Sequence, residues 1–268
     1  MIVNWTLLEF MDQIAFLEFK EKIYWSSYTP KAHEPFSATV RLVQGIYEEF
    51  SSMARAMLRQ RIYANYRISD MDRAMVRIAA KRISECVEIA DPRINPDAHE
   101  IKYRPASSVH SLSETPITER AQMEQVLKTL EKNCRRADVK FLSDRPVAAV
   151  LLNSRLEPMA ASWNSSRENR TQHAEVRTLQ QYWLIEQKPV PRGAILVCSL
   201  RPCGMCAGMI WHLCEDPFSV RVIYLQDDPG PAARGTILNK GVSAEQSGIL
   251  GAQPVEMSMD RAQAVGFL

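Results

Sequence analysis

Two short stretches of the chain carry the residue types that bind a metal ion. Cys203 and Cys206 stand two residues apart in PCGMC (202–206), and His173 and Glu175 stand upstream in the tripeptide HAE. Zinc prefers Cys sulfur and His nitrogen in a tetrahedron, and a catalytic zinc keeps its fourth position for water. We expect His173, Cys203 and Cys206 to hold one ion, with Glu175 facing the same cleft in a different role.

The pair of cysteines has other interpretations. A CxxC pair is also typical of a structural zinc knuckle or of a redox dithiol. A closed structural site requires a fourth Cys or His, and it gives Glu175 no purpose. His212 and Cys214 lie six and eight residues beyond Cys206. On one helix they stand about 9 to 12 Å away along the axis, too far to bind the same ion, so we expect both to be packing residues.

Strands and helices must alternate to position the two motifs. Strand-like runs occur at 146–153, 157–163, 193–199, 219–225 and, more weakly, 254–259. Helical patterns occur at 173–187 and 203–215, and at 115–138 with Thr115 as the N-cap and Pro116 in the first turn. Each motif therefore opens a helix, where backbone N–H groups favour thiolates. The alternation predicts an α/β domain whose sheet is covered on both faces.

The first half of the chain has a different pattern. Apolar residues at near-helical spacing between 53 and 90 indicate amphipathic helices. The apolar start, MIVNWTLLEFMDQIAFLEFK, indicates a core helix or a strand–helix unit. Four prolines and many Ser and Thr residues at 91–116 indicate a linker. We predict a smaller, mostly helical N-terminal domain at 1–105, a linker at 106–116 and the α/β domain at 117–268.

Composition limits the class of protein. The chain has 268 residues, 46% of them hydrophobic and 24% charged, as in soluble globular proteins with room for two domains. No uncharged stretch approaches the roughly 18 residues needed to span a bilayer, so we expect no membrane partner. Six cysteines are too sparse for a disulfide scaffold, which favours reduced thiols and a cytoplasmic location. A net charge of +2 says little about partners.

The order of the motifs is itself informative. H-x-E followed by P-C-x-x-C is the pattern of zinc deaminases. Residues 117–268 resemble the cytidine deaminase-like superfamily, most closely its tRNA adenosine deaminase branch. The resemblance is carried by HAEVRTLQ, by LRPCGMCAGMI and by Trp163-Asn164 before the HAE helix.

This resemblance implies a three-layer α/β/α fold and a role for each site residue. It implies one zinc ion per chain, held by His173, Cys203 and Cys206, with a bound water or hydroxide that attacks C6 of adenine or C4 of cytosine. Glu175 would be the catalytic acid and base.

The resemblance also implies contacts to the substrate. Asn164 would hydrogen-bond the nucleoside, and the small Ala174 would let the base approach. Arg201 stands where the family usually has an acidic residue. We therefore expect it at the pocket rim, in contact with substrate.

Basic residues gather in the first half of the chain. Residues 53 to 82 hold eight Lys or Arg, and Arg73, Arg77 and Lys81 recur at every fourth position. Such a helical face is either solvated or in contact with phosphates. Beside a base-modifying domain, we expect it to contact RNA.

The sequence thus predicts a hydrolase, a zinc-dependent deaminase of adenine or cytosine within RNA, with tRNA-like substrates favoured and a homodimer possible. Two alternatives stay open. One is a deaminase of a free nucleobase, nucleoside or nucleotide. The other is an inactive zinc-stabilised module that binds RNA or protein.

Overall fold

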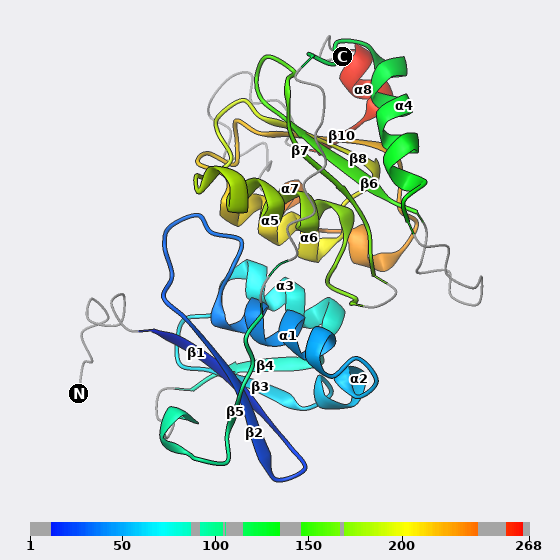
Figure 1. Ribbon diagram of the computed structural model, residues 1–268. Coiled ribbons are helices and arrows are strands. Elements are labelled where there is room, and N and C mark those ends of the chain that lie inside the picture. Colours follow the sequence, from blue (N-terminus) through cyan, green and yellow to red (C-terminus); the bar gives the residue numbers. More distant parts are fainter. Residues whose placement is uncertain are drawn as a thin grey trace. The chain divides into compact units, whose positions relative to one another are not determined.

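The computed structural model describes residues 12–86, 92–103, 105, 115–134, 146–166, 169–240 and 256–264. The chain divides into two compact units, Met1–Arg104 and Pro105–Leu268, shown in Figure 1. No helix within the described ranges is long and apolar enough to cross a membrane.

The first unit is built on a sheet in the order β4-β3-β1-β2-β5. Its strands are β1 (Gln13–Phe19), β2 (Lys22–Tyr28), β3 (Arg61–Ala64), β4 (Arg82–Glu85) and β5 (His99–Glu100). Its helices are α1 (Ala38–Glu49), α2 (Ala54–Met57) and α3 (Asp70–Ala79), with a 3-10 turn, η2 (Pro92–Ile94). β1 is antiparallel to β2 and β3, whereas β4 is parallel to β3 and β5 to β2.

Helices α1 and α3 begin at a shared polar network. Ser37 and Ser69 are their N-caps, and each side chain accepts a hydrogen bond from the first turn that follows it. The buried Asp72 carboxylate accepts hydrogen bonds from the hydroxyls of both serines. One carboxylate therefore fixes two helix starts side by side, which holds both helices against the sheet.

The prediction of a mostly helical N-terminal domain is wrong. Near-helical spacing between 53 and 90 arises from short helices that alternate with β3 and β4, each strand only four residues long. Periodicity does not separate helix from strand in runs of that length. The chain start (1–20) was predicted as a core helix or a strand–helix unit. Its residues 1–11 lie outside the described residues, and residues 13–19 form a strand that pairs with residues 22–28 in a β-hairpin.

The second unit is built on a sheet in the order β10-β9-β8-β6-β7. Its strands are β6 (Ala148–Leu152), β7 (Pro158–Trp163), β8 (Ile195–Leu200), β9 (Arg221–Gln226) and β10 (Glu256–Ser258). Its helices are α4 (Arg120–Glu131), α5 (Ala174–Glu186), α6 (Gly204–Leu213), α7 (Ile237–Lys240) and α8 (Met259–Ala264), with a 3-10 turn, η3 (Pro231–Ala233). β8, β9 and β10 run parallel, and β6 is antiparallel to β7 and β8.

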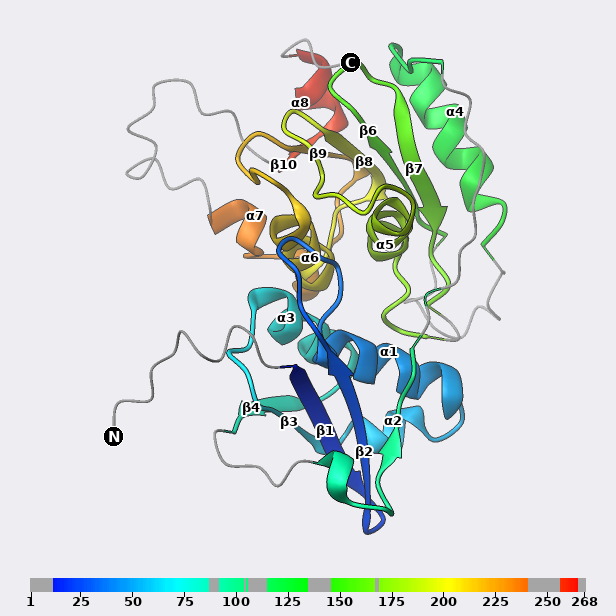
Figure 2. The same cartoon turned by 60° about the vertical axis from the view of Figure 1, so that its left-hand side comes forward.

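Helices cover both faces of this sheet (Figure 2). On one face, Val150 and Leu152 of β6 pack in a core cluster with Met123 and Leu127 of α4 and with residues of α8. Figure 2 shows α5 and α6 on the opposite face, where the Thr178 hydroxyl donates to the carbonyl of Ala149. Successive residues of β6 thus serve opposite layers, which explains why the whole strand is buried. The predicted three-layer α/β/α fold is confirmed.

Two predicted boundaries differ from the structure. Helix α4 begins at Arg120 rather than near 117, because Ile117 instead donates its backbone N–H to Leu156 and joins the core. Most of the predicted linker, at 106–114, lies outside the described residues. The start of the Pro-rich stretch belongs to the first unit, since Ile101 and Tyr103 are buried there.

Candidate metal centre and active site

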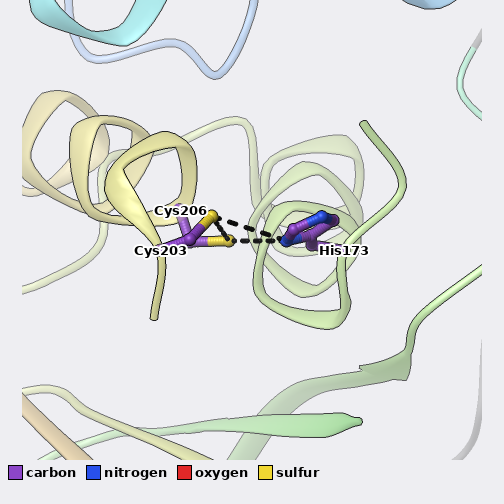
Figure 3. Close-up of side chains that lie close together, drawn as sticks. All are labelled: His173, Cys203 and Cys206. Atoms are coloured by element: carbon purple, nitrogen blue, oxygen red, sulfur yellow. Dashed lines mark hydrogen bonds between the residues drawn. The ribbon is translucent and has the colours of Figure 1, made fainter. Parts of the chain in front are cut away.

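Two helix starts bring the metal-binding side chains together. His173 is the N-cap residue of α5 and Cys203 the N-cap residue of α6, both with extended backbone. Cys206 lies in the first turn of α6. Because α5 and α6 pack against one another on the same face of the sheet, their first turns present the three side chains to one point (Figure 3).

The spacing of the three donor atoms fits a tetrahedral zinc site. The Cys203 and Cys206 sulfurs lie 3.6 Å apart, and His173 Nδ1 lies 3.6 Å from the first and 3.5 Å from the second. Zn–S bonds of about 2.3 Å and Zn–N bonds of about 2.0 Å place tetrahedral ligands about 3.8 Å (S–S) and about 3.5 Å (S–N) apart. Both cysteines are free thiols. The donor set and its dimensions therefore suit a single zinc ion.

Protonation also favours a metal site. Hydrogen bonding with Cys206, together with the His173 imidazole, lowers the pKa of the Cys203 thiol well below its usual range. Burial raises the pKa of the Cys206 thiol. Burial lowers the pKa of His173, but the charge and hydrogen bond of Cys203, together with the charge of Glu175, outweigh burial and raise that pKa to about 9. One thiolate is thus already stabilised, and thiolate is the form that binds a metal.

Glu175 lies at the second position of α5 and is 3% exposed. Burial raises the pKa of its carboxyl, and the charge of Cys203 adds to the effect, whereas His173 opposes it. The Cys206 side chain hydrogen-bonds to it. Among the described residues, the grouped metal donors are His173, Cys203 and Cys206, without Glu175. A buried carboxyl with a raised pKa, next to a metal site, is suited to carrying protons.

The same grouping leaves out two other candidates. His212 lies partly buried in the last turn of α6, and Cys214 is the buried C-cap residue of that helix. Neither is a member of the donor group.

The loop before α5 is organised by residues that the sequence analysis did not single out. The side-chain oxygen of the buried Asn169 accepts hydrogen bonds from the backbone and hydroxyl of Thr171. Gln172 donates its backbone N–H to Asn169 and accepts one from Ser165. An Asn two residues before a Thr is a local turn signal that could have been found in the sequence. The loop fixes the backbone that leads into His173.

Asn164, the predicted nucleoside contact, lies at the start of this loop. Its side-chain oxygen accepts from the backbone N–H of Val147 and from the Cys134 thiol, both at 3.0 Å. Its side-chain nitrogen donates to the Ser166 hydroxyl. The oxygen thus ties the start of β6 to the end of β7. Contact with Cys134 was not predicted, because it joins residues 30 positions apart.

Ala174 and Arg201 lie in different surroundings. Ala174 is fully buried as the first residue of α5, between His173 and Glu175. Arg201 follows β8 and points toward the far edge of the sheet. Its Nε donates to Glu256 of β10 at 2.5 Å, and its Nη1 donates to Asp227 at 3.2 Å. These contacts tie the turn that carries Cys203 to strand β10.

We predict that Arg201→Ala destabilises the second unit by about 3–5 kcal/mol. The Glu256 side chain is 1% exposed, so its charge would lose the main compensation for its burial. Urea unfolding measures the change, with Arg192→Ala as control, because the Arg192–Glu215 pair is exposed and long at 3.9 Å. Arg201→Met combined with Glu256→Met should regain most of the loss. If Arg201→Ala proves as stable as the control Arg192→Ala, the prediction is contradicted.

Only two of the three residues of the predicted basic face, Arg73, Arg77 and Lys81, lie on one helix. Arg73 and Arg77 lie exposed on α3, but Lys81 follows the end of the helix, which stops at Ala79. Arg73 forms an ion pair with Glu85 at 3.1 Å. The prediction of a continuous helical face with three cations is therefore wrong, since Lys81 lies beyond the end of the helix.

Comparisons with known proteins agree with this geometry. Residues 138–247 match the family model described as Bd3614-like deaminase. No curated protein matches the chain. Among solved structures, a tRNA:A34 deaminase studied for A-to-I editing is 24% identical, over 52% of this chain and 98% of its own, with a TM-score of 0.37.

A dCMP deaminase from the cyanophage S-TIM5 also matches. Its apo form is 20% identical over 40% of this chain and 82% of its own, with a TM-score of 0.28. Its complex with dCMP and dUMP is 18% identical over 53% and 98%, with a TM-score of 0.31. By the family match, the part of the chain at 138–247 is similar to Bd3614-like deaminases, which are of the cytidine deaminase-like type.

Proposed function

We propose that this protein is a zinc-dependent hydrolytic deaminase that acts on adenine or cytosine within RNA. One observation carries the proposal: three donors at tetrahedral spacing lie beside the buried Glu175, which is not a fourth ligand. A structural zinc site is closed by four protein ligands, whereas a catalytic site keeps a position open. The three-donor group therefore supports catalysis over the alternative of an inactive zinc-stabilised module.

The roles of the side chains follow from where they lie. His173, Cys203 and Cys206 would hold the ion. Zinc, when bound, lowers the pKa of water and so supplies a nucleophile near neutral pH. Glu175 would accept a proton from the attacking water and pass it to the ring nitrogen. It would then take the second proton from the hydroxyl now on the ring carbon and deliver it to the exocyclic amine, which leaves as ammonia while that carbon becomes a carbonyl.

Two further residues would position the base. Ala174 brings no side chain beyond a methyl group between His173 and Glu175, so a planar ring can approach the first turn of α5. Asn164 would hydrogen-bond the nucleoside, as the resemblance implies, from the loop that leads into α5. Its side chain also contacts Val147, Cys134 and Ser166, and these contacts hold it in place. Arg201 is bound to Glu256 and Asp227, and any contact with substrate would be to its remaining donors.

The eight Lys and Arg residues between residues 53 and 82 are all exposed, and such a concentration of cations favours a polymer with many phosphates over a free nucleotide. The test is ammonia release by the purified, zinc-loaded chain from single-stranded RNA and from a panel of free adenine and cytosine nucleosides and nucleotides. Release from RNA is the expected result. Release from a free nucleotide alone would move the substrate to the alternative class, and no release from any of them would contradict a deaminase.

A further inference from the structure

The sheet of the first unit has an outer face that α1 and α3 leave uncovered. In β3, Ile62 and Ala64 are fully buried, and they alternate with the exposed Arg61 and the half-buried Tyr63. Because successive residues of a strand point to opposite faces, Arg61 and Tyr63 lie on the side away from the helices. Figure 1 shows both helices on the same side of this sheet.

Strand register joins these residues to others on the outer face. Arg61 is paired with Arg82 in parallel β4, and Tyr63 is paired with Ser84. On the other side, Tyr63 is paired with Phe16 of β1, and their rings stack with centroids 5.3 Å apart and an interplanar angle of 23°. Paired residues share a face. We call these five residues (Phe16, Arg61, Tyr63, Arg82 and Ser84) the outer patch.

Within the described residues, the two arginines of the outer patch form no ion pair, and the nearest acidic residue on this face of β1 is the exposed Glu18, two residues after Phe16. Arg61 and Arg82 are both exposed, and no described acidic side chain forms an ion pair with either of them. Like charges directly opposite each other destabilise a sheet. The Arg61 guanidinium is held by the Ser84 hydroxyl at 2.6 Å, which orders it without neutralising it.

The aromatic pair supplies the second half of a binding surface. Phe16 and Tyr63 are partly exposed, whereas Trp25, the partner of Phe16 in β2, is only 8% exposed. Phe16 and Tyr63 therefore stay accessible at the level of the sheet where their neighbour Trp25 is covered. Flat aromatic rings beside fixed cations suit a chain of bases and phosphates, because the bases stack on the rings while guanidinium groups bind the phosphates.

We propose that the outer patch binds single-stranded RNA, with the two arginines on phosphates and the Phe16–Tyr63 pair under a base. The choice of RNA over DNA rests on the proposed function. The patch has room for a few nucleotides, and it would hold the polymer through contacts that do not depend on base sequence.

The test is fluorescence anisotropy of the full zinc-loaded chain with a labelled 12-nucleotide single-stranded RNA. Arg61→Glu with Arg82→Glu should weaken binding at least about tenfold and reduce the salt slope by about 1.4, the value for two lost phosphate contacts. The matched control is Arg155→Glu with Lys188→Glu, an equal charge reversal at exposed positions of the second unit. Tyr63→Leu should weaken binding about fivefold or more with an unchanged salt slope.

Equal weakening by the two double variants would overturn the proposal, as would failure of the wild-type chain to bind. Stronger binding of single-stranded DNA or duplex RNA of the same sequence would also overturn it. Ammonia release from any free nucleotide that the wild type accepts is measured in parallel. If that activity stays intact while RNA does not bind, the patch fails and the deaminase chemistry stands. If RNA binds to the outer patch but no substrate releases ammonia, the outer patch stands and the proposed deaminase chemistry fails.

Discussion

Replacing Glu175 with Gln is expected to lower the deamination rate by about 10²- to 10⁴-fold while zinc content stays at about one ion per chain. The amide has nearly the shape of the carboxyl, so the first turn of α5 should keep its packing. It cannot accept and return a proton, however. Burial holds the pKa of the Glu175 carboxyl above its usual value, which brings it toward the pH range where proton transfer in both directions is efficient.

The measurement is the rate of ammonia release together with elemental analysis of zinc. Glu186→Gln is the matched control, because Glu186 is the exposed last residue of the same helix. Its activity should equal that of the wild type. Loss of zinc from Glu175→Gln would make Glu175 a ligand, and an unchanged rate would exclude it as the proton carrier.

Replacing Cys206 with Ser is expected to reduce zinc from about one ion per chain to near zero and to abolish activity. The Cys206 sulfur lies within 3.6 Å of both other donors and is fully buried, and the donor group found among the described residues has no fourth member to replace it. A structural consequence follows as well, because ion binding contributes to folding free energy when the ligands come from two different helices. We expect this variant to unfold at a lower temperature than the zinc-loaded wild type.

Cys214→Ala provides the control for this variant. Cys214 is a buried thiol at the other end of the same helix and lies outside the donor group. It should keep its zinc and its activity, whatever it loses in stability. Full zinc occupancy of the Cys206→Ser chain would contradict the proposed ligand set. A disulfide between Cys203 and Cys206 in the purified wild type, without metal, would instead indicate a redox dithiol.

Much of the second unit could be predicted from the sequence because its elements are long and their patterns distinct. The strands are continuous apolar runs such as Ala148–Leu152, and each helix that carries a motif opens at that motif. The donor group also follows from sequence, since His173 and the two cysteines stand at helix starts that share one face of the sheet. In the second unit, the sequence patterns of the individual strands and helices all agree with one three-layer architecture.

The first unit could not be predicted in the same way. Strands of four residues, such as Arg61–Ala64, give too few positions to separate a period of two from a helical period. The ion pair between Arg201 and Glu256 could not be predicted from the sequence either, because the two residues are 55 positions apart. Nothing near Arg201 in the sequence signals that a buried carboxylate will meet it. The outer patch depends likewise on register between strands that are distant in the chain.

The central claim, hydrolytic deamination of bases in RNA by Glu175 and the zinc ligands, is tested most directly by sequencing RNA. Total RNA from cells that produce the wild-type chain is compared with RNA from cells that produce the Glu175→Gln chain at the same level. The account predicts A-to-G or C-to-T changes at defined positions with the wild type, and their absence with the variant. Identical sequence profiles in the two samples would contradict it.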